Sequence, residues 1–180
     1  VIPPDDFMVI YSDTGMEIPP SLEIFKLTKE IYTKQYPELI FHLSKNHKSI
    51  LDNWSEFGAP SRLHRWCCTV DKTAPLYKLL KEINGNGKQP NVLVFEGVRA
   101  EESNAREKYA RIGKGVKHNN VINARPIFDW NATEIYLYLF RRKLPFNNGY
   151  RYGLSRVGCV ICPFSSEWSE HIVKKLYPEN

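Results

Sequence analysis

Long apolar runs are missing from this 180-residue chain. None approaches the roughly 20 residues that a helix needs to cross the hydrocarbon core of a bilayer, so we expect no membrane partner. The signatures of zinc peptidases (HExxH) and of P-loop nucleotidases (GxxxxGK[ST]) are absent too. The five histidines are scattered without metal-ligand spacing. These absences argue against a membrane protein, a zinc peptidase of that type and a Walker-type ATPase.

Composition and charge are those of a globular protein with anionic partners. Hydrophobic residues make up 42% and charged residues 25% of the chain, which are ordinary values. The net charge is +5 with a pI near 9.0, which favours nucleotides, sulfate or phosphate groups, or nucleic acid as partners. The length predicts a single domain over residues 1–180. No methionine stands at the start, so we expect sequence to precede Val1.

Cysteine is scarce, and its four copies fall into two distant pairs. Cys67 and Cys68 are adjacent, whereas Cys159 and Cys162 are separated by two residues. Distant thiol pairs that a fold brings together are how proteins build four-thiolate sites. Gly158 precedes the second pair and a proline follows it, which suits a tight ligand loop.

Several interpretations of the four cysteines remain open. A disulfide framework is disfavoured, because 180 residues can bury a core without it and adjacent cysteines are poorly placed to bridge each other. Structural zinc sites commonly use two C-x₂-C pairs, from which a tandem pair departs. We favour an iron–sulfur cluster, whose bulk lets neighbouring cysteines reach different irons, over zinc and over buried, chemically idle thiols. Reduced thiols indicate a cytoplasmic protein.

Apolar runs and helical periodicities alternate along the chain. They predict an α/β fold with a mainly parallel, Rossmann-like sheet flanked by helices. The sequence around 110–124, rich in Gly, Asn and basic residues, is expected to be a loop. Ser21 is the expected N-cap of the first helix. Strands are expected at 7–11, 39–43 and 91–97, and helices at 21–36, 48–57, 69–82 and from 132.

Polar residues follow two of the expected strands, at the sheet edge where ligands bind in α/β folds. Asp13, Thr14 and Gly15 offer a carboxylate, a hydroxyl and an N–H group to a nucleotide or to Mg²⁺; the alternative is an ordinary Asp-containing turn. Arg65 and Lys72 flank the first cysteine pair. Other basic residues, which are able to clamp phosphate or sulfate or are merely solvated, are Arg99, Arg106, Arg111, Lys114, Lys117 and Arg125.

Several motifs coincide in order along the chain. They are Asp13-Thr14-Gly15, Arg65-Trp66-Cys67-Cys68, Glu96-Gly97-Val98-Arg99, Pro126-Ile127-Phe128-Asp129-Trp130, Leu144-Pro145-Phe146-Asn147 and Gly158-Cys159-x-x-Cys162-Pro163. In this order they resemble the phosphoadenosine phosphosulfate (PAPS) reductase family of adenine nucleotide α-hydrolases, over almost the whole chain. The cysteine set is similar to that of the [4Fe–4S] subgroup, which includes adenylyl-sulfate reductases. Related sulfurtransferases include ATP pyrophosphatase components of DNA phosphorothioation systems.

The resemblance implies a site for ATP, PAPS or adenylyl sulfate beside a cluster. Four cysteines would hold the cluster, with residues 145–180 as its C-terminal part. It also implies a sulfur-donor protein (a cysteine desulfurase) or a thiol reductant as partner. The residues expected at the nucleotide and its anionic groups are Asp13, Thr14, Gly15, Arg65, Lys72, Gly97, Arg99 and Arg106.

The chain departs from the family pattern in two places. The Ser-Gly-Gly-Lys-Asp-Ser loop expected before Phe7 is absent, so we expect an N-terminal truncation that removes a strand and this loop, or a chain that cannot hydrolyse nucleotide alone. A Glu-Cys-Gly-Leu-His tail with a nucleophilic cysteine is also absent. We therefore favour Fe–S-dependent sulfur transfer to an adenylated acceptor, such as nucleic acid. The alternatives are thiol-dependent reduction of PAPS or adenylyl sulfate, and a non-catalytic assembly module.

Overall fold

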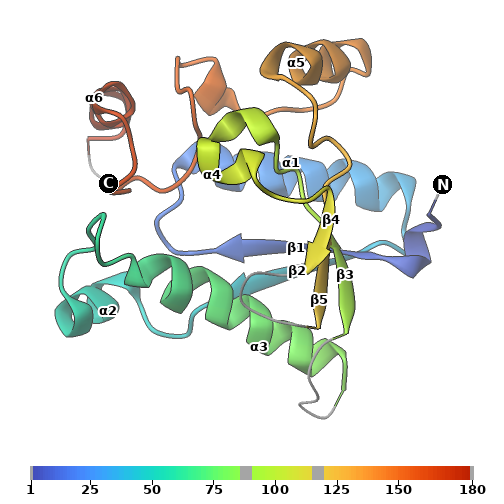
Figure 1. The fold of residues 1–180 in the computed structure, drawn as a ribbon, viewed down its shortest axis with the longest axis horizontal. Coiled ribbons are helices and arrows are strands. Elements are labelled where there is room, and N and C mark those ends of the chain that lie inside the picture. Colours follow the sequence, from blue (N-terminus) through green and yellow to red (C-terminus); the bar gives the residue numbers. More distant parts are fainter. Residues whose placement is uncertain (1, 86–90, 115–119, 179–180) are drawn as a thin grey trace. The chain divides into compact units, whose positions relative to one another are not determined.

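The computed structural model describes residues 2–85, 91–114 and 120–178 (Figure 1). It divides into two compact units. The first unit contains Val1–Leu79 and Pro145–Asn180, and the second contains Leu80–Leu144. Strands alternate with helices, and each unit contains one pair of parallel strands. This confirms the predicted α/β fold with a mainly parallel sheet.

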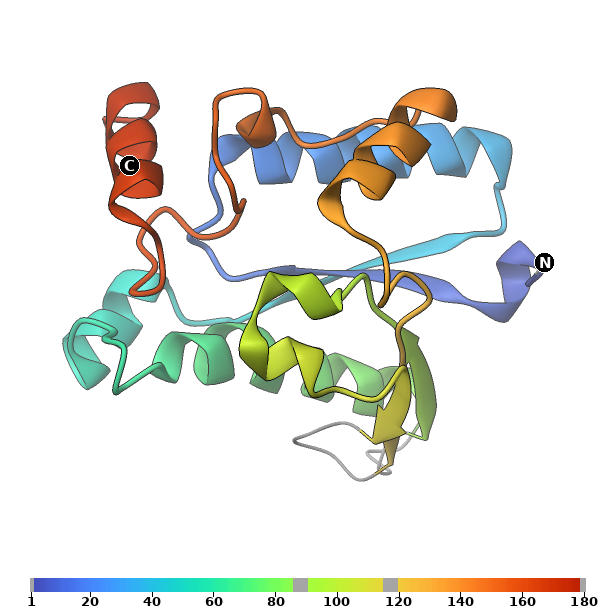
Figure 2. The same cartoon turned by 45° about the horizontal axis from the view of Figure 1, so that its top comes forward.

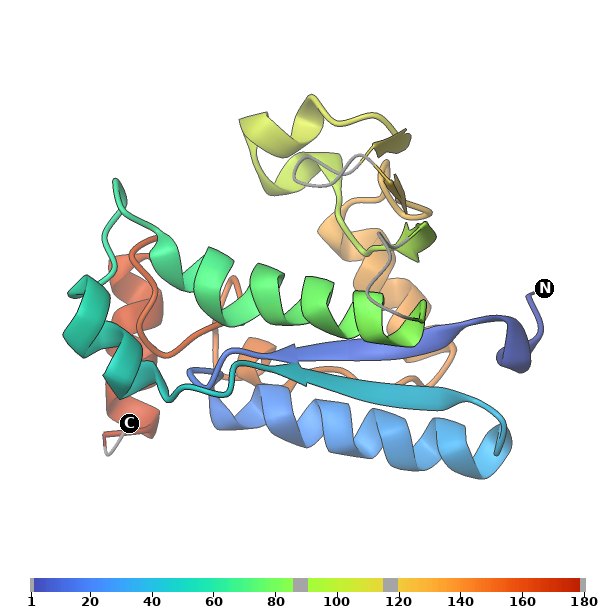
Figure 3. The same ribbon diagram turned by 90° about the horizontal axis from the view of Figure 1, so that it is seen from below.

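A β-α-β arrangement forms the centre of the first unit. Strands β1 (Met8–Asp13) and β2 (Ile40–Lys45) pair in parallel, with Asp13 opposite Lys45 at their carboxyl ends. The connecting helix is α1 (Pro19–Gln35), as parallel pairing requires a crossover. Helices α1 and α3 (Ala74–Ile83) lie on opposite faces of this strand pair (Figure 3).

The start of α1 differs from the prediction that Ser21 caps it. The helix begins at Pro19 rather than after Ser21, and its N-cap is Ile18. Proline suits the first helical turn, because the N–H groups there have no intrahelical partner. Ser21 is instead buried inside the helix and accepts a hydrogen bond from Asn147 Nδ2 (3.3 Å). The end of α1 before Pro37 is as predicted.

A helical stretch with a π-turn carries the first cysteine pair. Helix α2 (Ile50–Phe57) precedes it and has a capping box between Ser49 and Asp52. Residues 66–67 are α-helical, the π-helix η2 spans Cys68–Thr73, and α3 follows directly. Segment η2 packs against both β1 and β2. Pro75 is the second residue of α3, at the point where the π-helix passes into the α-helix.

The C-terminal part of the first unit ends in helix α6 (Glu167–Leu176), which is capped by Ser166. Val173 of α6 packs with Ile18 and Leu154 in one buried cluster. Figure 2 accordingly shows α6 beside the start of α1. This packing joins residues from the two ends of the chain into one core.

The second unit holds a three-stranded sheet in the order β3-β5-β4. Strands β3 (Val92–Phe95) and β5 (Val121–Ala124) are parallel, and β4 (Ile112–Lys114) is antiparallel to β5. The prediction of a loop over 110–124 is therefore wrong at both ends, and its middle, 115–119, lies outside the described residues. The unit also contains α4 (Asn104–Glu107) and α5 (Ala132–Arg141), whose predicted Asn131–Glu134 capping box is present.

Short 3₁₀ turns complete the described chain: η1 (Pro4–Asp6), η3 (Ala100–Glu102) and η4 (Asn148–Tyr150). Over the three described ranges, every helix is too short or too polar to cross a membrane.

Candidate functional site

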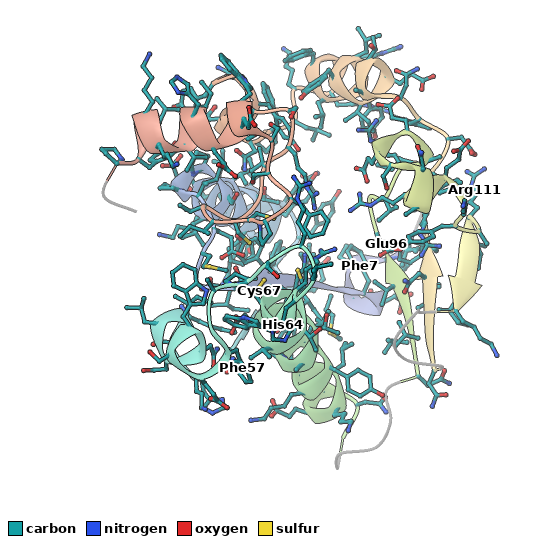
Figure 4. The ribbon with its side chains drawn as sticks, turned by 60° about the vertical axis from the view of Figure 1, so that its left-hand side comes forward. Phe7, Phe57, His64, Cys67, Glu96 and Arg111 are labelled. Atoms are coloured by element: carbon teal, nitrogen blue, oxygen red, sulfur yellow. The ribbon has the colours of Figure 1, made fainter. Side chains whose placement is uncertain are left out.

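All four cysteines line one cavity of about 320 Å³ in the first unit. Cys67 and Cys68 stand at the start of η2, and Cys159 and Cys162 lie in the loop before α6. Figure 4 labels Cys67, which lies close to the C-terminal loop. The structure therefore brings together the two pairs that are far apart in the sequence.

A short backbone bridge holds the second cysteine pair in place. Residues Glu17 and Cys159 form an isolated antiparallel bridge. The N–H of Ile18 donates to the Gly158 carbonyl (3.3 Å), and the N–H of Val160 donates to the Met16 carbonyl (2.6 Å). The loop that carries Cys159 is thus bonded to the segment that follows β1.

The first pair is held in a small apolar core. Cys67 is buried with Met16 and Trp66, and Cys68 and Cys159 pack against this cluster. The indole Nε1 of Trp66 donates to the Gly58 carbonyl (3.0 Å) at the end of α2. Side chains from both cysteine pairs thus share one core.

Burial makes ionised thiols costly in this cavity. It raises the pKa of Cys67 to about 11, and the neighbouring Cys68 adds to the effect. Burial also raises the pKa of Cys159, although the Thr14 hydroxyl, 3.7 Å from its sulfur, works in the opposite direction. Thiolates therefore need a compensating positive charge here, which bound metal supplies.

Positive side chains meet that need in part. Arg65 Nη2 donates to Cys68 Sγ (3.4 Å), and its guanidinium lies 4.2 Å from the centre of the Phe164 ring. This bond to Cys68 raises the pKa of Arg65. Lys72 lines the same cavity. The two cations predicted beside the cysteines are therefore found there.

The four thiols are of a residue type that binds soft metals. The four cysteines are free, and they line a cavity rather than meet at one point. Among the described residues, no group of three or more His, Cys, Asp or Glu side chains is arranged to hold a metal ion. The cluster expected from the sequence stays a prediction.

The Asp13-Thr14-Gly15 segment forms a tight turn at the carboxyl end of β1. Asp13 Oδ1 accepts from the N–H of Gly15 (2.8 Å), and its Oδ2 pairs with Lys45 (3.0 Å). Gly15 has φ +79°, a conformation that strains residues with a side chain. Both the N–H and the hydroxyl of Thr14 donate to the Glu17 carboxylate. Thr14 lines the cysteine cavity, so this turn borders the site.

The Asp13–Lys45 pair predicts an acid-dependent loss of stability. Burial works to raise the pKa of Asp13, but hydrogen bonds from Lys45 and Gly15 outweigh it, so the pKa lies below its ordinary value of 3.8. Stabilisation is therefore complete above that value and is lost as the pH falls through the lower folded-state pKa. We expect Asp13→Asn to lower the free energy of unfolding by about 1 kcal/mol at pH 7 and by less at pH 3.

Urea unfolding at the two pH values measures this difference. Asp129→Asn is a suitable control, because that side chain is 69% exposed and lies 3.6 Å from its Arg111 partner. An Asp13→Asn deficit that is as large at pH 3 as at pH 7 would contradict the prediction.

The remaining predicted residues, Gly97, Arg99 and Arg106, belong to the second unit. Arg99 pairs with Glu101 (2.8 Å) and donates to the Trp130 carbonyl (3.4 Å). Arg106 pairs with Glu102, which also lies 3.8 Å from Arg99. These guanidinium groups are thus engaged inside their own unit, and their role in anion binding stays a prediction.

The sequence did not single out several cavity residues. No motif marks these residues, so their place at the cavity is known only from the fold. The sequence indicates them only by their nearness to Thr14 or to the second cysteine pair. They are Glu17, Ser155, Arg156, Ser165, Ser166 and Ser169.

Comparison with known proteins identifies the family. The model of the phosphoadenosine phosphosulfate reductase domain matches residues 2–165. The chain belongs to this family. An adenosine 5'-phosphosulfate reductase of Anoxybacillus flavithermus is 26% identical over 164 residues, which are 88% of this chain and 63% of the relative. The named relatives are reductases of sulfur metabolism, and such reductases are enzymes.

A further relative and a solved structure extend the comparison. The uncharacterized protein MJ0066 of Methanocaldococcus jannaschii is 32% identical over 174 residues, which are 97% of this chain and 34% of that protein. The chain thus spans about a third of the length of this relative. The crystal structure of PAPS reductase from Candida auris in a phosphate complex has a TM-score of 0.62 at 19% identity, covering 88% of this chain and 70% of that one. This likeness shows a shared fold.

Proposed function

We propose that this chain is the core of an iron–sulfur enzyme that reduces the sulfate group of adenylyl sulfate or PAPS. The observation that carries the proposal is the gathering of all four cysteines on one cavity with Arg65 and Lys72. The family and the reductases among its relatives support the substrate class. Free thiols are required, and a reducing compartment such as the cytoplasm preserves them.

The cluster-binding residues in this proposal are Cys67, Cys68, Cys159 and Cys162. A bound [4Fe–4S] cluster supplies a charged, redox-active centre at the cavity. The chain contributes the charge balance around it. The N–H of Arg65 that points at Cys68 Sγ is the kind of outer contact that sets cluster properties. Burial favours the protonated thiol of Cys67, and binding of a metal would displace that proton.

In this proposal the nucleotide binds at the Asp13–Gly15 turn, because α/β folds bind ligands at the carboxyl ends of their strands. Arg65 and Lys72 then offer positive charge to the sulfate. In the reduction, a thiol of a reductant outside these 180 residues attacks sulfur and the bond between sulfur and the phosphate oxygen breaks, which releases the adenosine phosphate. A second thiol attacks the sulfur of the first, sulfite leaves, and a disulfide remains; the thiols provide both electrons.

Sulfur transfer to an adenylated acceptor is a second candidate. Its specific support is that every cysteine of these 180 residues lines the cavity. If all four hold a cluster, none of these residues remains to attack sulfur covalently. The segment after Cys162 instead runs into α6, which is capped by Ser166. ATP would adenylate an acceptor, such as nucleic acid, with release of pyrophosphate, and a persulfide from a cysteine desulfurase would displace AMP.

Full-length protein supplied with [³⁵S]adenylyl sulfate and a thiol separates the candidates. We expect release of [³⁵S]sulfite by the wild-type protein and by Ser165→Ala, and none by Cys162→Ser; both residues line the cavity. ATP-dependent pyrophosphate release without sulfite would replace reduction by sulfur transfer. Nucleotide binding or cluster content without either reaction would support a non-catalytic assembly module.

A further inference from the structure

A buried carboxylate lies in the middle of the π-helix that carries the first cysteine pair. Asp71 is 1% exposed, and so is Asn53 of α2, which contacts it. None of the salt bridges found among the described residues includes Asp71. Amide groups thus bind this carboxylate, and a buried acceptor of this kind needs such partners.

Two asparagines from different segments converge on one oxygen of this carboxylate. Asp71 Oδ1 accepts from Asn53 Nδ2 (2.7 Å) and from Asn46 Nδ2 (2.9 Å). Asn46 lies in the turn between β2 and α2. Its Nδ2 also donates to the Val70 carbonyl (3.3 Å). The turn and α2 are thereby tied to η2.

Side-chain bonds supplement the backbone bonds of the π-helix. Its backbone bonds run from each N–H to the carbonyl five residues earlier, as from Ala74 to Thr69. Pro75 has no N–H to give to Val70, and Asn46 takes its place. The Thr73 hydroxyl similarly donates to the Cys68 carbonyl (3.0 Å). The wider turn rotates each residue through a smaller angle than an α-helix does, which lets adjacent Cys67 and Cys68 face one cavity.

We propose that Asp71 is a positioning residue for the Cys67–Cys68 pair. By accepting from Asn46 and Asn53, it fixes the rotation of η2 about its axis and so the direction of both sulfurs. The inference rests on the proposed cluster, for which these sulfurs are ligands. The hydrogen-bond acceptor at Oδ1 carries the effect, because both asparagines donate to that one atom.

Full-length, anaerobically purified variants test this role. Asp71→Leu removes the acceptor at similar size, and we expect the half-life of bound iron in excess chelator to fall about tenfold, as for outer-shell partners of metal ligands. The EPR signal of the reduced protein should change in shape. Asp71→Asn keeps Oδ1, so its iron half-life should stay within about twofold of wild type.

The control must destabilise the same unit without touching η2. Leu39→Ala removes a buried side chain just before β2, at the opposite end of that strand from Asn46, so it should lower the melting temperature but leave the iron half-life and the EPR signal unchanged. If Asp71→Leu does not fold, Asn53→Ala removes one donor and should shorten the half-life severalfold.

Three results would overturn the inference. They are wild-type iron retention with an unchanged EPR signal in Asp71→Leu, an Asp71→Asn defect equal to that of Asp71→Leu, and the same EPR change in the Leu39→Ala control. If the wild-type protein binds no iron, the proposed cofactor fails by itself. Capture of paired thiols by phenylarsine oxide then tests positioning: slower capture in Asp71→Leu than in Leu39→Ala supports it, and equal rates refute it.

Discussion

Replacing Cys159 with serine is expected to reduce bound iron from about four atoms per chain to below about one. A cubane held by four thiolates loses a corner, and serine is a poor replacement for a soft sulfur ligand. Cys159 also packs against the core formed by Met16, Trp66 and Cys67. Loss of the cluster should therefore loosen the loop before α6 and make the protein prone to aggregate.

Iron and sulfide assays on anaerobically purified, full-length protein measure this change, and the wild-type protein should be brown. Ser155→Ala is the matched control, because Ser155 lines the same cavity a few residues before Cys159. Equal iron content in Cys159→Ser would exclude Cys159 as a ligand. Colourless wild-type protein with one tightly bound zinc would replace the cluster by a zinc site.

Replacing Trp66 with alanine should cost about 3–5 kcal/mol of stability. Its side chain is almost fully buried, its ring lies 5.3 Å from that of Phe57, and its indole N–H bonds to the Gly58 carbonyl. The substitution removes all three interactions and leaves a cavity beside Cys67. Chemical unfolding should show a lower midpoint with an unchanged denaturant dependence.

Trp168→Ala provides the comparison. That ring is 57% exposed, although its N–H donates to the Gly153 carbonyl (2.9 Å), so its loss should cost only about 1 kcal/mol. Similar losses in the two variants would show that Trp66 does not anchor the core of the site.

Local sequence signals predicted much of the fold. Helices were expected at 48–57 and from 132, and the structure has α2 at Ile50–Phe57 and α5 at Ala132–Arg141, each beginning at a capping box between residues three apart. The strand β1 and the turn after it follow from an apolar run that ends in Asp-Thr-Gly. These features depend on neighbours in the chain, which the sequence displays directly.

Features that depend on residues far apart in the sequence could not be predicted. Ser21 has the chemistry of an N-cap, but two prolines before it start the helix earlier. Strands β4 and β5 pair with each other through residues that composition alone assigned to a loop. The bond between Asn53 and Asp71 joins α2 to the π-helix, and nothing in the local sequence of either residue indicates it.

The grouping of the cysteines, in contrast, could be predicted although the two pairs are far apart in the sequence. Thiols in two remote pairs suggested one shared site, and the fold places all four on one cavity. Their function as ligands stays a prediction. The cations Arg65 and Lys72 could be placed beside them because they flank the first pair in sequence. Glu17 and Arg156 reach the cavity only through folding.

The first unit is assembled from two stretches of chain, with residues 80–144 between them. During synthesis, the partner loop of Cys67 and Cys68 does not yet exist when those residues leave the ribosome. The pocket can be closed only after Cys162 has emerged. A ligand that needs all four thiols can therefore be bound only after both stretches have been made, and a product that stops before Cys159 would leave Cys67 and Cys68 without their partner loop.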